Sequence, residues 1–166
     1  MKNLIQSLIA GSLVVLSAVG SSAADRPLPA FQVVALTGQR VGSADVADTG
    51  NWLIVYTRPQ CAACDQVLRL LVPADTGPQP AIPPQSLARV RIVVGGAAAP
   101  AVNALRQRYP ALADARWYGD PSSDMAAALA LHGAPAVFGM HDLHIAWTSQ
   151  GALPITRSAM AEWLNR

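Results

Sequence analysis

The sequence predicts an α/β domain in which helices flank a mixed β-sheet. Segments with strand character alternate with segments of helical spacing, and two strand-like segments in succession, 135–140 and 143–149, precede a last helix. Such alternation favours parallel strands, and a terminal hairpin adds antiparallel ones at an edge. The chain has 166 residues, 52% hydrophobic and 13% charged, which suits one domain with one sheet.

Residues 1–24 have the pattern of a secretory signal peptide. A positively charged start is followed by the apolar run 4–19 and by the small residues Ser22 and Ala24, which suit a cleavage site. The run is shorter than the ~20 residues of a spanning helix, although a retained membrane anchor stays the alternative. We therefore expect a periplasmic protein with a single mature domain over 25–166, in a compartment that oxidises unprotected thiols.

The first half of that domain is expected to hold two strands and a helix. FQVVAL (31–36) has strand character, and a loop over 41–50 follows it. NWLIVYT (51–57) is β-branched and aromatic with little alternation, which is typical of a strand buried on both faces at the sheet centre. From Cys61 the apolar residues recur at helical spacing until Pro73 ends the pattern.

The alternation continues after a loop rich in proline and glycine. The next segments are a strand, a helix and a short strand: ARVRIVV (88–94), APAVNALRQRYP (99–110) and ARWYG (115–119). In the helix that follows, Asp120 is the expected N-cap, Pro121 the first helical residue and Gly133 the C-terminal stop. After the hairpin, Thr156 is expected to cap the closing helix.

The two cysteines of the chain, Cys61 and Cys64, lie where the central strand gives way to a helix. Unpaired N–H groups and the helix dipole stabilise a thiolate at a helix N-terminus, so Cys61 is the expected attacking thiol. Cys64, one turn further on the same face, is the expected resolving thiol. Arg58 would add positive potential and Asp65 would oppose it, and the sequence does not rank the two.

Two other uses of this cysteine pair are weaker. A structural disulfide that closes so short a loop removes little entropy from the unfolded chain. A zinc site would need His141 and His144 beside the expected hairpin turn as further ligands, but their spacing is shorter than usual. His132 is expected to bond the last carbonyls of a helix. We therefore expect redox use of the cysteines, without a metal or an organic cofactor.

Three separated segments resemble the thioredoxin-like family. They match its central strand with the CxxC helix, its cis-proline loop, and its final turn with the C-terminal helix: WLIVYTRPQCAAC (52–64), HGAPAVFGM (132–140) and QGALPITRSAMAEWLNR (150–166). The resemblance implies an exported thiol–disulfide oxidoreductase with Cys61 and Cys64 as catalytic residues and protein thiols or disulfides as partners. It also implies that Pro135 is the cis-proline and that the backbone of Ala134 pairs with an incoming substrate chain.

The sequence departs from the family's pattern at several positions. Ala62 and Ala63 stand between the cysteines, where the family's reductases commonly carry Gly-Pro and its exported oxidases Pro-His, so the direction of electron flow stays open. Val55 occupies the position of the family's buried acid, and Gln60 replaces a frequent aromatic residue. The chain also has one more strand–helix step than minimal thioredoxin has, placed before Trp117.

This longer plan also resembles thioredoxin-fold periplasmic components of conjugative transfer systems and integrating conjugative elements. The second hypothesis is therefore a non-catalytic assembly or binding component of a conjugative secretion apparatus, with conjugative transfer proteins as partners. A membrane redox protein is a further expected partner of the enzyme. The formal charge of +2, with Lys and Arg scattered, provides no basic stripe for nucleic acid.

Overall fold

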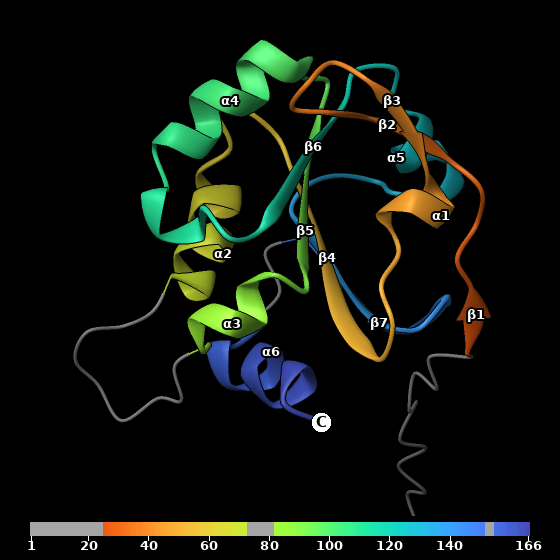
Figure 1. Ribbon diagram of the computed structural model, residues 1–166, viewed down its shortest axis with the longest axis vertical. Coiled ribbons are helices and arrows are strands. Elements are labelled where there is room, and N and C mark those ends of the chain that lie inside the picture. The colour runs from red at the N-terminus through yellow and green to blue at the C-terminus, as the bar shows by residue number, and fades with distance from the viewer. Residues whose placement is uncertain (1–24, 73–81, 152–154) are drawn as a thin grey trace, which may run out of the picture.

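The computed structural model describes residues 25–72, 82–151 and 155–166. In these ranges eight strands form one sheet in the order β1-β8-β7-β4-β5-β6-β2-β3, with helices on both sides (Figure 1). The expected signal peptide, residues 1–24, and the proline-rich segment 73–81 lie outside the described residues. Within the described ranges, no helix is both long and apolar enough to cross a membrane.

The strands are β1 (Arg26–Pro27), β2 (Gln32–Ala35), β3 (Arg40–Gly42), β4 (Asn51–Thr57), β5 (Val90–Gly95), β6 (Arg116–Asp120), β7 (Ala136–His141) and β8 (His144–Gln150). The helices are α1 (Ser43–Val46), α2 (Ala62–Leu71), α3 (Pro84–Leu87), α4 (Ala99–Gln107), the 3-10 turn η1 (Pro110–Leu112), α5 (Asp124–Ala128) and α6 (Arg157–Leu164). Strands β4, β5 and β6 are parallel, and the strands at both edges pair antiparallel. The predicted mixed α/β sheet is confirmed.

Strand β4 lies near the middle of the sheet and is buried on both faces, as its lack of alternation predicted. Leu53 and Val55 pack in the core cluster that α2, α4 and α6 cover. Trp52, Ile54 and Tyr56 point to the other face and pack with residues of α1 and α5. The central strand therefore belongs to both halves of the core.

The segment 41–50 differs from the predicted loop, because it contains the end of β3 and the short helix α1. The backbone N–H of Ser43 donates to the carbonyl of Phe31 at 2.9 Å. The carboxylate of Asp45 accepts from the N–H of Gly42 at 3.1 Å, and Val46 is buried. A single helical turn is too short to give a periodic signal in the sequence.

The helix after β6 begins later and ends earlier than predicted. Asp120 is the last residue of β6 rather than the N-cap, Pro121 precedes the helix, and α5 ends at Ala128 instead of near Gly133. The carboxylate of Asp120 still accepts hydrogen bonds from N–H groups in the first turn of α5. The prediction that Asp120 bonds the start of this helix is confirmed, but its position as N-cap is wrong. A carboxylate at the end of a strand can accept hydrogen bonds from the free N–H groups of a helix that starts four residues later.

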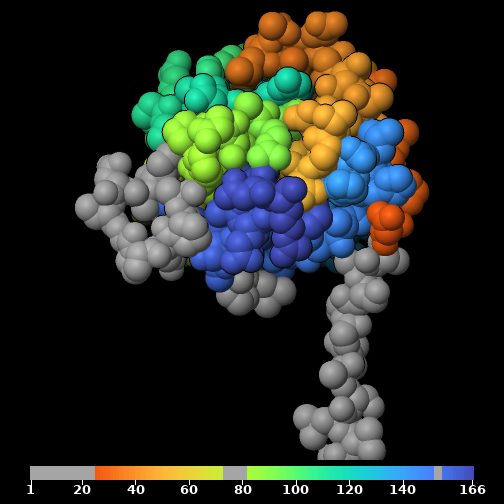
Figure 2. Space-filling view, turned by 60° about the horizontal axis from the view of Figure 1, so that its bottom comes forward, coloured from red at the N-terminus to blue at the C-terminus, as the bar shows by residue number. Residues whose placement is uncertain are grey.

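The C-terminal helix α6 is held at both ends. Thr156 is its N-cap and accepts a hydrogen bond from the N–H of Ala159 at 3.1 Å, which confirms the predicted cap. The guanidinium of Arg89 donates to the carbonyls of Asn51, at 3.2 Å, and Leu164. Figure 2 shows α6 (dark blue) against the segment that contains α3 (lime) and the one that leads into β4 (orange-yellow). Arg89 therefore ties the end of this helix to the start of the central strand.

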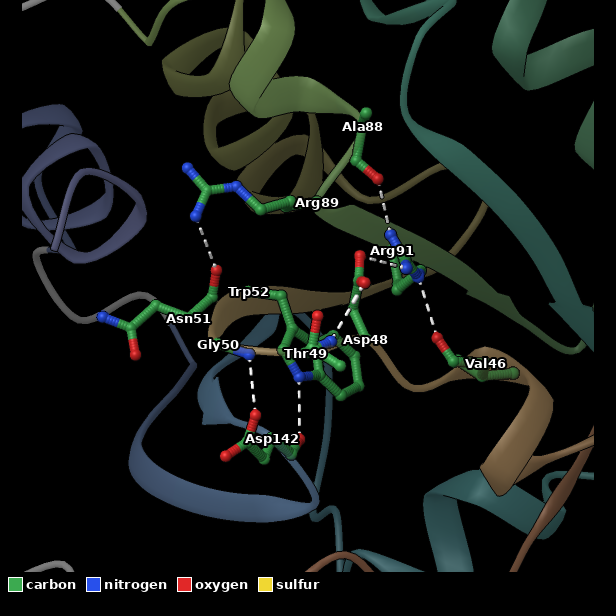
Figure 3. A network of polar contacts seen from close by, with 10 residues as sticks. All are labelled: Val46, Asp48, Thr49, Gly50, Asn51, Trp52, Ala88, Arg89, Arg91 and Asp142. Atoms are coloured by element: carbon green, nitrogen blue, oxygen red, sulfur yellow. Dashed lines mark hydrogen bonds and ion pairs between the residues drawn. The ribbon is translucent and has the colours of Figure 1, made fainter.

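Arg91 on β5 is fully buried, with 0% of its side chain exposed, and is surrounded by partners (Figure 3). It donates to the carbonyls of Val46 and Ala88, at 2.8 and 2.7 Å, and forms an ion pair with Asp48 at 2.7 Å. The guanidinium also lies 5.5 Å from the centre of the Trp52 ring. A buried charge is tolerated when it is bonded in this way, and here it joins α1 and α3 to the sheet.

Replacing Asp48 with alanine tests this ion pair. Because the change leaves the buried guanidinium without its anion, Asp48→Ala should lower the free energy of unfolding by about 3 kcal/mol at neutral pH. The double variant Asp48→Ala/Arg91→Met should lose less unfolding free energy than the two single variants lose in sum. Denaturant unfolding of the wild type, both single variants and the double variant measures this difference. Strictly additive losses would show that the pair is not coupled.

The same pair predicts a loss of stability in acid. Burial alone would raise the pKa of Asp48, but hydrogen bonds from Arg91 and Thr49 and the charge of Arg91 outweigh it and hold the pKa below its ordinary 3.8. The contribution of Asp48 is therefore complete above about pH 4 and is lost as the pH falls through the lowered pKa. Asp48→Ala should lack this acid-dependent part of the unfolding free energy.

Candidate active site

Cys61 and Cys64 form a disulfide at the start of α2, with their Cα atoms 5.1 Å apart. Cys61 is the N-cap residue and is half-buried, whereas Cys64 lies in the first turn and is only 1% exposed. The first sulfur can therefore be approached from solvent, and the second lies behind it.

The backbone at the start of α2 favours negative charge on the sulfur of Cys61. The N–H of Cys64 donates to this sulfur at 3.2 Å. Once the disulfide is opened, this N–H and the positive end of the helix dipole would stabilise a thiolate at Cys61. The structure thus places Cys61 at the helix terminus that the sequence predicted.

The loop before β7 forms the other side of the site. The sulfur of Cys61 lies 3.9 Å from the carbonyl oxygen of Ala134, a residue 73 positions away in the sequence. The peptide bond between Ala134 and Pro135 is cis, as the family resemblance implied. Antiparallel pairing of β7 with β4 brings this loop to the end of the strand that leads to Cys61. All four residues expected to form the site are therefore neighbours, and their roles in exchange remain predictions.

The acidic residue next to the site, Asp65, is bonded to groups at the end of α4. The hydroxyl of Tyr109 donates to Asp65 Oδ1 at 2.7 Å, and the guanidinium of Arg108 lies 3.6 Å from Oδ2. Burial and this contact with Asp65 raise the pKa of Tyr109. The Tyr109 hydroxyl and the Arg108 guanidinium thus offset the negative charge of Asp65, which was expected to oppose the positive potential of Arg58 at Cys61.

A buried polar pair, Tyr56 and Asp120, lies at the same carboxyl end of the parallel strands as the cysteines, on the sheet face opposite to α2. The hydroxyl of Tyr56 donates to Oδ2 of Asp120 at 3.2 Å, and the two residues are 1% and 0% exposed. The ring of Tyr56 passes over Gly95 on β5, where any side chain would collide with it. Burial and the Asp120 carboxylate raise the pKa of Tyr56 to about 12, while Arg58 acts in the opposite direction.

This pair was not among the contacts predicted from the sequence. Tyr56 was expected only as part of a buried strand, and Asp120 only as a helix cap. The available signal was that Tyr56, Gly95 and Asp120 stand at the carboxyl ends of three successive strands. In a parallel sheet these ends meet at one edge, but the strand order has to be known before the residues can be placed together.

The alternative zinc site does not form. His141 and His144 face each other across the hairpin of β7 and β8, and His141 pairs with Asn51 at the start of β4. The cysteines follow the other end of this 7-residue strand, about 20 Å away. No group of three or more His, Cys, Asp or Glu side chains suited to a metal occurs among the described residues. His132 is also displaced from its expected role, because α5 ends four residues before it.

No protein-family model and no curated protein matches this sequence. Among solved structures, the chain is similar to a secreted disulfide oxidoreductase of Mycobacterium tuberculosis that is homologous to DsbE of E. coli (TM-score 0.61, 13% identity, 81% of this chain and 94% of that one). It is also similar to a thiol:disulfide interchange protein of the thioredoxin family from Chlorobium tepidum (TM-score 0.59, 13% identity, 86% and 96%).

A third similar structure is a thio-disulfide isomerase from Thermus thermophilus, with a TM-score of 0.58, 17% identity and coverage of 85% of this chain and 94% of that one. At sequence identities of 13–17%, the similarity to these structures shows a shared fold. The chain has a thioredoxin-like fold, and the fold predicted from the three sequence segments is confirmed.

The buried hydroxyl of Tyr56 gives a spectroscopic prediction. The ultraviolet tyrosinate titration of the wild type minus that of Tyr56→Phe should show one group with a midpoint near pH 12 instead of 10. Because the pKa is raised in the folded state, the contribution of Tyr56 to stability is complete below about pH 10 and is lost as the pH rises toward 12. A midpoint at the ordinary value would contradict the bond to Asp120.

Proposed function

We propose that this protein is a thiol–disulfide oxidoreductase that exchanges disulfides with protein substrates through Cys61 and Cys64. The observation that carries this proposal is the position of the accessible Cys61 sulfur, at the N-terminus of α2 and 3.9 Å from the backbone of Ala134. A substrate chain that pairs with the backbone beside Pro135 would bring its own cysteine to Cys61. The similar structures described as disulfide oxidoreductases and interchange proteins support the same activity.

In the oxidising direction, a substrate thiolate attacks the sulfur of Cys61 and displaces Cys64 as a thiolate. The resulting mixed disulfide is resolved when a second substrate thiolate attacks the substrate sulfur and releases Cys61 as a thiolate. The substrate loses two electrons and two protons, and the Cys61–Cys64 pair gains the electrons. In the reducing direction, Cys61 attacks a substrate disulfide and Cys64 then attacks Cys61 to release the substrate as a dithiol.

The two cysteines have different roles because their surroundings differ. Cys61 combines exposure with a hydrogen-bond donor, the N–H of Cys64, directed at its sulfur. Cys64 is buried and is bonded to the sulfur of Cys61, which suits a resolving thiol. The net direction follows from the reduction potential of the pair relative to its partners, so a measured potential would assign the protein as oxidase, reductase or isomerase.

The periplasm is the compartment that fits this activity. Residues 1–24 have the composition of a signal peptide, and one of the similar structures is described as secreted. The mature chain, residues 25–166, would then act on exported proteins and exchange electrons with a membrane redox protein. A binding component of a conjugative apparatus would share the fold and the compartment but would need no thiol chemistry.

The cysteine roles predict which variant is trapped on its substrates. Cys64→Ser should accumulate mixed disulfides with protein substrates, because the attacking thiol is kept and the resolving thiol is lost. Cys61→Ser should form none. Non-reducing electrophoresis with and without dithiothreitol, after mixing with a disulfide-containing protein, measures both.

Two outcomes would contradict this proposal. Adducts on Cys61→Ser instead of Cys64→Ser would reverse the roles. Binding of conjugative transfer proteins that is unchanged by Cys61→Ser, with no turnover of any protein disulfide by the wild type, would assign the chain to the non-catalytic class.

A further inference from the structure

We propose that Tyr56 and Asp120 are positioning residues for disulfide exchange: their hydrogen bond anchors α5, and α5 in turn holds the Ala134–Pro135 loop in place beside Cys61. This inference rests on the proposed function and extends it to residues on the other face of the sheet. Neither side chain is hydrogen-bonded to a sulfur, so an effect on exchange would be indirect, and the bonds of Asp120 lead to the loop through α5.

Asp120 is the point where three elements are joined. Its carboxylate accepts hydrogen bonds from the hydroxyl of Tyr56 on β4, at 3.2 Å, and from the N–H groups of Met125 and Ala126 on α5, at 3.4 and 3.1 Å. The residue ends β6 and is 0% exposed. A buried carboxylate is stable only while such donors remain in place, so the position of α5 is coupled to that of Tyr56.

The chain that follows α5 is bonded back onto the helix. The N–H of Leu131 donates to the carbonyl of Ala126 at 2.8 Å, and Ala130 adopts a positive φ of 51° to make this turn. Leu129 is buried in the same core cluster as Tyr56, and Leu131 and Ala134 pack against that cluster. A shift of α5 is therefore transmitted over a few residues to the loop that faces Cys61.

Tyr56 connects both sides of the site. It pairs with Ala136 at the start of β7, directly after the Ala134–Pro135 loop. It also stands in the strand that leads to Cys61, two residues before Arg58, whose charge acts on the same hydroxyl. The absence of a side chain at Gly95 is what allows the phenol to reach across β5 to Asp120.

The variant Tyr56→Phe distinguishes two roles of Asp120: bonding only the first turn of α5, or positioning the loop together with Tyr56. Tyr56→Phe removes the hydroxyl and leaves intact both hydrogen bonds from the N–H groups of α5 to the Asp120 carboxylate. If Asp120 serves only as the cap of α5, this variant should exchange disulfides as the wild type does. If the pair positions the loop, substrates that depend on the loop should be affected selectively.

The experiment compares Tyr56→Phe with the wild type in two reactions. With a disulfide-containing protein as substrate, KM should rise by about tenfold while kcat stays within about twofold, a loss comparable to that of one hydrogen bond to a charged group. Alkylation of reduced Cys61 by iodoacetamide, which needs no docking loop, should keep its rate. Tyr118→Phe is the matched control, since Tyr118 is a buried tyrosine of β6 in the same cluster, and it should leave KM unchanged.

Amide hydrogen exchange provides a readout that does not depend on activity. Residues 129–136 should exchange faster in Tyr56→Phe than in the wild type or in Tyr118→Phe, while α2 exchanges as before. Asp120→Asn should show the same pattern more strongly, because it weakens the bonds to α5 as well.

The outcomes separate this inference from the proposed function. An unchanged KM in an active Tyr56→Phe protein, or equal losses in exchange and in Cys61 alkylation, would overturn the positioning role. A wild type that turns over no protein disulfide would instead overturn the proposed function, while faster hydrogen exchange at 129–136 would still support the coupling between Tyr56 and the loop.

Discussion

The burial of β4 on both of its faces is the constraint on which the rest of this structure depends. Its side chains divide between two core clusters, so helices have to cover the sheet on both sides. Because the strand is buried from Trp52 to Thr57, the chain returns to the surface only beyond its carboxyl end, at Arg58. Cys61 lies at that exit and begins α2, which returns over one face of the sheet. The position of Cys61 is thus a consequence of how the central strand is enclosed.

In the part of the chain that the structure describes, two charged side chains are fully buried at the sheet, and each is surrounded by hydrogen-bond partners. Arg91 holds α1 and α3 through two carbonyls and Asp48. Asp120 holds α5 through two backbone N–H groups and Tyr56. Apolar packing is not directional, whereas these bonds specify which helix end lies on which strand. Only the second network lies at the edge where the cysteines are, which is why we assign it a part in exchange.

Apart from Gln60 and Asp65, the residues adjacent to the cysteines in the sequence and the Ala134–Pro135 loop are apolar. Ala62 and Ala63 separate them, Val55 lies in the strand behind them, and Ala134 faces Cys61 through its carbonyl group. Stabilisation of a thiolate at Cys61 would therefore come mainly from the backbone at the start of α2 and from the helix dipole. Polar side chains that bear on the site act from further away, through the elements to which they are bonded.

The sequence by itself determined the central strand, the helix that starts at Cys61, the Thr156 cap and the position of both cysteines at the start of that helix. Each of these depends on residues within one or two turns of the chain, where periodicity and capping chemistry are expressed directly. The tertiary structure alone decided that α1 forms, that α5 starts at Asp124, that the histidines lie at the opposite end of β4, and that Tyr56 bonds Asp120. These features depend on strand order and register, which bring together groups that no local spacing in the sequence relates.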